Sequence, residues 1–342
     1  MVSAGTDNQV PLAQAPMPPG LVGAPGRARC HPGARAARSS AQPGPRVTVS
    51  TPRLNRRRGR AYSRAPSRCA RMVRGAVAGR LAGREQPVDA EIAASLADIG
   101  DATRRLLATT ATVSDAQARG PSLLPGWTRG HVLTHVARNA DGLANLLRWA
   151  RTGTQTPMYA SRAARDADIE AGAGRGAAAL AEDVRDSAAA FAGEAARVPD
   201  DAWTVPVRVL VGSPFPAREV LSRRLSEIEI HHVDLAAGCH PRDWPRDFVI
   251  ASLPRIAGSF YGRDDVPACL LRPDGGGDPL RIGPAGVGVA AEARQTEPGG
   301  DGSALTVDGP AWALMAWLLG RSAGDGLTVY QARALPVLPP WR

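Results

Sequence analysis

The chain has 342 residues, 44% of them hydrophobic, and a formal net charge of +10. This length favours about two domains, and the apolar fraction is sufficient for buried cores. A mean hydropathy of −0.19, without an apolar run of about 18 residues, argues against a membrane-spanning helix. We therefore expect a protein with no membrane partner.

The positive charge is concentrated near the N-terminus. Residues 1–84 hold 16 arginines and a single acidic residue, Asp7, which leaves 26 basic and 31 acidic residues in the remainder. The body of the protein is thus mildly acidic, and its surface is not the basic stripe expected of a nucleic-acid-binding domain. We expect no specific nucleic-acid partner, although the basic segment alone could bind nucleic acid non-specifically.

Residues 1–85 are rich in Arg, Pro and Ala and show no sustained apolar period. We predict a disordered tail. An arginine-rich, acid-poor leader also resembles a transit peptide. The simplest interpretation is an extension from an upstream start codon, with Met72 as the alternative start.

The cysteines predict neither a disulfide framework nor a zinc ribbon, because none of them forms a CxxC pair. They are Cys30, Cys69, Cys239 and Cys269. This usage is typical of a reducing compartment, and we expect the protein in the cytoplasm.

Residues 86–240 predict a four-helix bundle. The expected helices cover about residues 88–112, 128–150, 176–198 and 216–238. Thr128 is a suitable N-cap for the second helix, and Gly238 a suitable stop for the fourth. The polar link at residues 152–173 is expected to be a loop, and residues 203–211 to be extended. Four helices joined by short and medium links are typical of a bundle.

Residues 241–342 predict a second, small α+β domain. Helices are expected at about residues 247–260 and 309–321, and strands at 268–272, 279–282, 304–307 and 327–330. The predicted fold class is therefore α plus α+β: a helical bundle followed by a small mixed unit.

A cluster of polar residues on the fourth predicted helix has metal-ligand spacing. Glu227 and His231 stand at i and i+4, which places them one turn apart on one face. Asp234 follows three residues later and either orients His231 or is a plain acid at the helix end. The second predicted helix carries His131 and His135, again four apart. Two such facing helices could supply a His/Glu/His set with an open coordination position.

Nearby residues have simpler interpretations. A single Glu/His pair at this spacing is a weak signal, since such side chains often pack or pair with neighbours. His232 is expected to be structural, and Glu229 to be solvated or paired with an arginine. Trp127 is most simply an apolar anchor at the end of the bundle.

Three segments together resemble the mycothiol-dependent maleylpyruvate isomerase family. They are Trp127–Leu147, Glu227–Leu235 and the ending Leu335–Trp341. The resemblance covers about residues 87–342. It implies a DinB-like metal-binding bundle followed by a sterol-carrier-like C-terminal domain. It also implies a divalent metal, usually zinc, and mycothiol as thiol cosubstrate.

Carried over to this sequence, the resemblance implies His135, Glu227 and His231 as metal ligands and Arg321 as a catalytic residue. His131 would then line the site or pack beside it. The expected function is a metal- and mycothiol-dependent isomerase or S-transferase acting on a small electrophilic substrate that resembles maleylpyruvate. A metal-dependent hydrolase and a non-catalytic metal- or ligand-binding regulatory module remain as alternatives.

Overall fold

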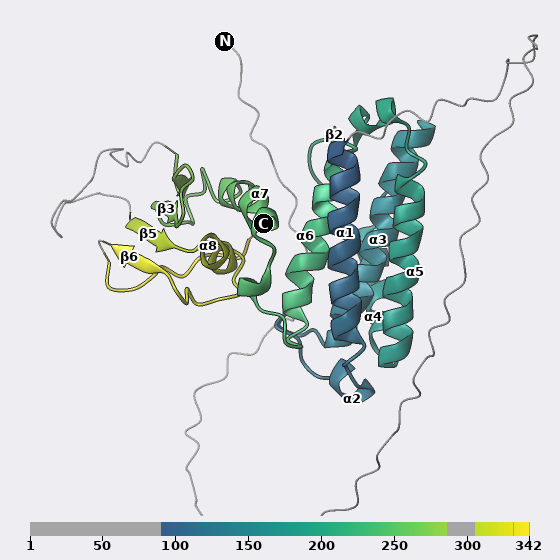
Figure 1. Cartoon of the computed structure of the whole chain (residues 1–342), viewed down its shortest axis with the longest axis horizontal. Helices are drawn as coiled ribbons and strands as arrows, with labels where there is room; N and C mark the ends of the chain where they lie inside the picture. The colour runs from purple at the N-terminus through teal and green to yellow at the C-terminus, as the bar shows by residue number, and fades with distance from the viewer. Residues whose placement is uncertain (1–89, 286–304, 331, 342) are drawn as a thin grey trace, which may run out of the picture. The chain divides into compact units, whose positions relative to one another are not determined.

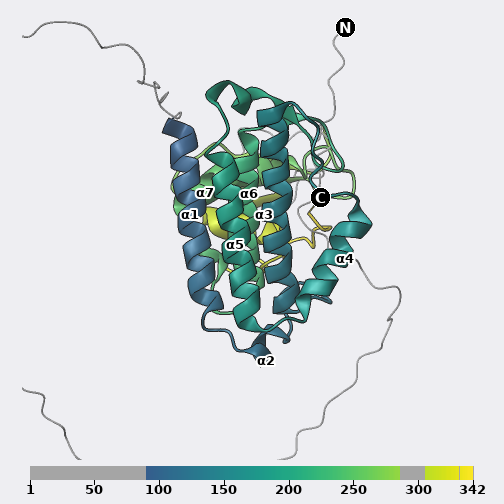
Figure 2. The ribbon, with the colours of Figure 1, turned by 90° about the vertical axis from the view of Figure 1, so that its right-hand side faces the viewer.

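Four long helices form the first part of the fold, seen in a computed structural model that describes residues 90–285, 305–330 and 332–341. They are α1 (Ala90–Thr110), α3 (Arg129–Thr152), α5 (Ala177–Ala195) and α6 (Glu219–Asp234). Contacts join α1 to α6, α6 to α3, α3 to α5 and α5 to α1, so the helices close a bundle (Figures 1 and 2). The predicted bundle is confirmed.

Helix α3 begins and ends where its sequence predicts. The Thr128 side chain accepts a hydrogen bond from the backbone N–H of His131, and the His131 ring accepts one from the backbone of Thr128. This reciprocal pairing satisfies N–H groups that have no partner within the helix. At the other end Gly153 takes a left-handed conformation with φ 71°, which glycine adopts without strain. Both termini of the helix that carries His135 are therefore fixed.

The expected loop at residues 152–173 is wrong in its second half, because α4 (Arg162–Ala173) is a helix. The Ser161 side chain caps its first turn by accepting from the Ala164 N–H. Gly130 lets α4 approach α3 closely, since a Cβ there would lie 2.1 Å from a backbone oxygen of Ala173. Few residues of α4 are buried, so the apolar period that predicts a helix is missing.

Several shorter elements complete the helical part. The four-residue helix α2 (Asp115–Ala118) precedes α3. Between α5 and α6 lie the 3-10 helix η1 (Asp200–Thr204) and the strands β1 (Pro206–Val207) and β2 (Phe215–Pro216), which pair antiparallel. The extended segment expected at residues 203–211 is thus shorter than predicted, and α6 begins after Pro216 because that residue belongs to β2.

The C-terminal part is a mixed sheet with two helices, as predicted. A short 3-10 helix, η2 (Pro241–Asp243), leads into it. Its other elements are α7 (Arg246–Gly258), β3 (Cys269–Pro273), β4 (Leu280–Ile282), β5 (Leu305–Gly309), α8 (Ala311–Leu318) and β6 (Thr328–Tyr330). The strand order is β4-β3-β5-β6. Strands β3 and β5 are parallel, and the outer pairs are antiparallel. Both helices contact the sheet, so it is packed on a helical layer.

Helix α6 contributes to two hydrophobic cores. Leu221 and Ile228 pack in the core of the bundle, whereas Ile230 and Val233 pack with apolar residues of the C-terminal part. The indole N–H of Trp244 donates to the Glu229 carbonyl at 2.9 Å. All described residues fall in one compact unit, and the predicted boundary between residues 240 and 241 stays a prediction.

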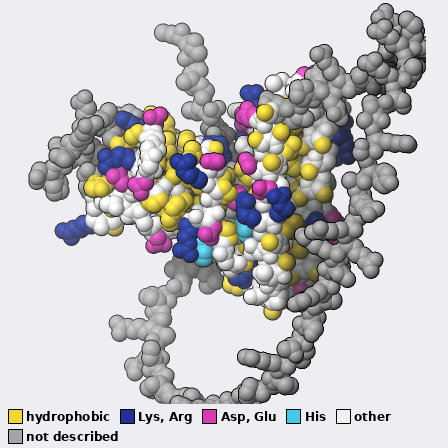
Figure 3. Space-filling model, in the orientation of Figure 1, with side chains coloured by type: hydrophobic (Ala, Val, Ile, Leu, Met, Phe, Trp, Pro, Cys, Tyr) yellow, Lys and Arg dark blue, Asp and Glu magenta, His cyan; other side chains and the backbone are white. Residues whose placement is uncertain are grey.

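Two further expectations concern the tail and the surface. The predicted disordered tail, residues 1–85, lies outside the described residues. Among those that are described, no helix combines the length and the apolar character needed to span a bilayer. On the face drawn in Figure 3, described arginines lie interspersed with aspartates and glutamates.

Candidate metal centre

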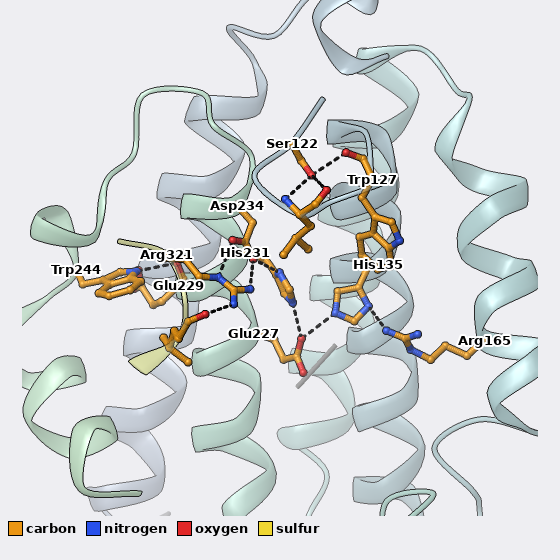
Figure 4. A network of polar contacts seen from close by, with 12 residues as sticks. Ser122, Trp127, His135, Arg165, Glu227, Glu229, His231, Asp234, Trp244 and Arg321 are labelled. Atoms are coloured by element: carbon orange, nitrogen blue, oxygen red, sulfur yellow. Dashed lines mark hydrogen bonds and ion pairs between the residues drawn. The ribbon is translucent and has the colours of Figure 1, made fainter. Parts of the chain in front are cut away.

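Three predicted ligands meet inside the bundle. His135 comes from α3, and Glu227 and His231 come from α6 (Figure 4). One ligand atom from each lies within 4.8 Å of the other two. Glu227 Oε2 is 2.9 Å from His135 Nε2 and 3.2 Å from His231 Nε2. All three residues are buried, and within the described ranges they form the one His/Cys/Asp/Glu group with such geometry.

The shared carboxylate controls the charges of this group. Burial alone would raise the pKa of Glu227, but hydrogen bonds from His135 and His231 outweigh burial and hold that pKa below its usual range. Burial lowers the pKa of His135 to about 4, in spite of its hydrogen bond with Glu227. Near neutral pH, Glu227 is therefore ionised and His135 is neutral, the protonation states that metal coordination requires.

His231 is oriented by a buried acid. Its Nδ1 lies 2.8 Å from Asp234 Oδ2. Burial opposes ionisation of Asp234, but the Arg321 guanidinium and the His231 hydrogen bond lower the pKa of the carboxyl to about 2. An ionised Asp234 accepts the Nδ1 proton and fixes the ring with Nε2 facing Glu227 at 3.2 Å. Burial lowers the pKa of His231, but hydrogen bonds with Asp234 and Glu227 outweigh burial and raise that pKa, so a metal ion would have to displace a proton from Nε2. This carboxylate–histidine arrangement is typical of metal centres. Of the two interpretations of Asp234, the contact favours the one in which it orients His231.

Arg321 lies behind Asp234. Its Nε donates to Asp234 Oδ1 at 2.9 Å, and its Nη2 donates to Oδ2 at 2.8 Å. This bidentate pairing matches the planar geometry of both groups. Arg321 thus contacts the acid that orients a predicted ligand, and its predicted catalytic role stays a prediction.

Sequence reasoning missed Arg165, which stands behind the other histidine. Its Nη2 lies 3.2 Å from His135 Nδ1, and its Nη1 donates to Asp166 Oδ1 at 2.6 Å. Arginine offers only donors, so His135 accepts at Nδ1 and carries its proton at Nε2, facing Glu227. Arg165 falls within the loop expected at residues 152–173. The signal that reveals its helix is the Ser161 cap.

The neighbouring histidines lie outside this group. His131 takes part in the cap of α3, and its Nε2 is 3.1 Å from Glu170 Oε2. It packs at the start of the helix and stacks against Trp127, with ring centroids 6.0 Å apart. His232 Nε2 instead lies 2.7 Å from the Thr109 hydroxyl on α1, which confirms a structural role.

The expectation that Glu229 is solvated or paired with an arginine is also confirmed. Its carboxylate forms an ion pair with Arg105 of α1. Because that contact directs the side chain toward α1, Glu229 does not join the ligand group, although it lies only two residues from Glu227.

The three ligands fit a divalent ion. Two imidazole nitrogens and one carboxylate oxygen are the donors that zinc takes in catalytic sites, where three protein ligands leave a fourth position open. The burial of the group and the Asp234–His231 contact add the enclosed, oriented surroundings that such sites have.

Comparison with known proteins identifies the helical part and the fold. Residues 99–236 match the model of the mycothiol maleylpyruvate isomerase N-terminal domain. A crystal structure of the mycothiol-dependent maleylpyruvate isomerase is similar at 27% identity, with a TM-score of 0.62, and a histidine-to-alanine variant at 28% and 0.64. Each match covers 73% of this chain and 97% of the other. No curated protein matches the chain. Residues 99–236 therefore form a domain of the mycothiol maleylpyruvate isomerase N-terminal domain family.

Proposed function

We propose that this protein is a metal-dependent isomerase or S-transferase that uses mycothiol to attack a small electrophilic substrate resembling maleylpyruvate. The observation that carries the proposal is the buried group of His135, Glu227 and His231. Support also comes from the similarity to a mycothiol-dependent maleylpyruvate isomerase. In this proposal the protein acts in the cytoplasm, without a membrane or a specific nucleic-acid partner.

The protein's own residues would hold and shape the site. His135, Glu227 and His231 would supply two nitrogens and one oxygen to a divalent ion, with zinc as the first candidate. Such an ion, when bound, lowers the pKa of a coordinating thiol and so supplies a thiolate nucleophile. Asp234 would keep His231 turned toward the ion, and burial of all three ligands would keep bulk water away from the reacting thiol.

A thiolate suits the proposed substrate class. Its addition to an electron-poor cis double bond turns that bond into a single bond, about which the adduct rotates. Loss of the same thiolate then gives the trans isomer and regenerates the thiol. With a substrate that carries a leaving group, the thiolate would instead form a carbon–sulfur bond while the leaving group departs with the electrons of its own bond, so that mycothiol is transferred to the substrate. Arg321 enters the proposal as the catalytic residue that the family resemblance implies.

Metal content tests the proposal. Elemental analysis of the full chain should find about one divalent ion per molecule, because three ligands form one site. His135→Ala and Glu227→Ala should lose the ion. His131→Ala is the matched control: it removes a histidine one turn from His135 on the same helix, outside the group, and should keep the ion. A parent that takes up no metal, even after incubation with zinc, contradicts the proposal.

Thiol dependence separates this function from its alternatives. With metal loaded, turnover of a cis-unsaturated acid should require added mycothiol. Turnover without any thiol would favour a metal-dependent hydrolase, since water would then take the open position. Bound metal without turnover of electrophilic acids would favour a non-catalytic binding module.

A further inference from the structure

Arg224 links the two helices that carry the predicted ligands. It lies on α6, three residues before Glu227, and its side chain is fully buried. Its Nη1 donates to the Val136 carbonyl at 2.8 Å and to Asn139 Oδ1 at 3.0 Å. Both acceptors belong to α3, and Val136 directly follows His135. One guanidinium nitrogen therefore ties α6 to α3 beside both halves of the ligand group.

This arginine is poorly satisfied for a buried charge. Its Nε and Nη2 have no hydrogen-bond partner among the described residues. Burial lowers the pKa of Arg224 to about 10, with the Glu227 charge acting in the opposite direction, so the group stays protonated at neutral pH. A buried charge with unmet donors is usually no more stable than an apolar side chain of similar size. Stability alone thus gives no reason for an arginine at this position.

We propose that Arg224 is a positioning residue of the metal centre, one that sets the separation of His135 and Glu227 by tying α6 to α3. This inference rests on the proposed function. A methionine of similar length would fill the space without donating to Val136 or Asn139, and the helices would then be free to shift. Because ligand atoms must meet one ion at about 2.0–2.2 Å, small shifts of either helix weaken binding.

The positive charge of Arg224 has the opposite influence on metal affinity to its positioning contacts. A guanidinium close to Glu227 repels a divalent cation, so its removal by itself should tighten metal binding. Positioning and charge therefore give changes of opposite sign in the Arg224→Met variant. If Arg224 served only stability, its replacement by methionine would lower the melting temperature of the protein and leave metal affinity unchanged.

The test compares metal binding by the full-length parent and Arg224→Met. Zn²⁺ affinity is measured by chelator competition, and Co²⁺ serves as a spectroscopic probe of ligand geometry. We expect Arg224→Met to weaken Zn²⁺ binding about tenfold or more, the range typical of residues that support ligands, and to alter the Co²⁺ absorption spectrum. Arg224→Lys, which keeps the charge and one donor group, should lie between parent and Met variant.

Arg151→Met provides a matched control. Arg151 Nε donates to Glu194 at 2.8 Å and links α3 to α5, a helix with no predicted ligand. This variant should lose thermal stability but keep the parent's metal affinity and Co²⁺ spectrum. Equal loss of affinity in Arg151→Met and Arg224→Met would show that any weakening of the bundle suffices, and would overturn the inference.

Other outcomes distinguish failure of the positioning role from failure of the proposed function. Unchanged or tighter Zn²⁺ binding by Arg224→Met, with an unchanged Co²⁺ spectrum, overturns the positioning role while the parent's bound metal preserves the proposed function. A parent without metal overturns both. If Arg224→Met does not fold, Asn139→Ala removes one acceptor and retains the arginine; it should weaken binding several-fold, and unchanged affinity would refute the inference.

Discussion

The two sides of the candidate metal centre differ in the group behind each histidine. On the α6 side, His231 Nδ1 faces the Asp234 carboxylate at 2.8 Å. On the α3 side, His135 Nδ1 faces the Arg165 guanidinium at 3.2 Å (Figure 4). A neutral imidazole that binds metal through Nε2 carries its proton at Nδ1 and needs an acceptor there. Asp234 is an acceptor, whereas arginine has only donors.

This difference indicates that metal binding would preserve the hydrogen bond behind His231 and break the contact behind His135. His231 can donate its Nδ1 proton to Asp234 both before and after metal binds, and a metal ion has only to displace the proton between Nε2 and Glu227. His135 carries its proton at Nε2 in the metal-free protein, where it donates to Glu227 at 2.9 Å. Coordination through that nitrogen requires the proton to move to Nδ1, and the present contact with Arg165 is then lost. The affinity for the metal ion should therefore depend strongly on Asp234, behind His231, and weakly on Arg165, behind His135.

The largest effect on this comparison is expected from Asp234→Asn. The amide keeps the size of the side chain but removes the charge that holds the proton of His231 at Nδ1. We expect Zn²⁺ affinity, measured by chelator competition, to fall about 10- to 100-fold. Thermal unfolding of the metal-free variant is the control, since Asp234 is fully buried and also contacts Arg321. If a folded Asp234→Asn variant binds Zn²⁺ as tightly as the parent, the group behind His231 matters no more for metal affinity than the group behind His135.

Arg321→Met tests the same side of the centre through a residue that contacts Asp234 rather than His231. Asp234 would keep its contact with His231 but lose two hydrogen bonds from the guanidinium. We expect Zn²⁺ affinity to fall less than in Asp234→Asn, by about three- to tenfold, because the carboxylate itself remains. Turnover should be lost if Arg321 also contacts substrate, as the family resemblance implies. Loss of turnover with unchanged metal affinity would show that Arg321 does not act through Asp234.

Sequence patterns were sufficient where one local rule determined the structure. The Thr128 cap defined the start of α3, and the i,i+4 spacing placed Glu227 and His231 on one face of α6. The family resemblance selected His135 over His131. The cap contacts of His131 now give the physical reason, since its ring is held at Thr128 and Glu170.

The missed features depend on contacts between distant segments. Arg165 lies 30 residues from His135 in sequence, and Arg224 lies 85 residues from Asn139. No spacing rule connects such pairs, and both arginines read as ordinary charged residues of a helix or loop. Helix α4 was missed because its packing on α3 depends on the absence of a side chain at Gly130 rather than on an apolar stripe. The grouping of His135, Glu227 and His231 could thus be predicted from the spacing and the family resemblance, and the place of Asp234 beside His231 from spacing alone, whereas the contacts of Arg165 and Arg224 could not.

The smallest effect is expected from Arg165→Met, the counterpart of Asp234→Asn on the α3 side. Arg165 has to leave His135 Nδ1 when metal binds, so its removal should leave Zn²⁺ affinity within about threefold of the parent or make it tighter, well below the loss expected for a supporting residue. Nitrogen NMR of the metal-free parent should find the His135 proton at Nε2, and the metal-bound protein should carry it at Nδ1. A tenfold or larger loss of affinity in Arg165→Met would instead assign Arg165 a supporting role, and the α3 side would then depend on its arginine as the α6 side depends on its carboxylate.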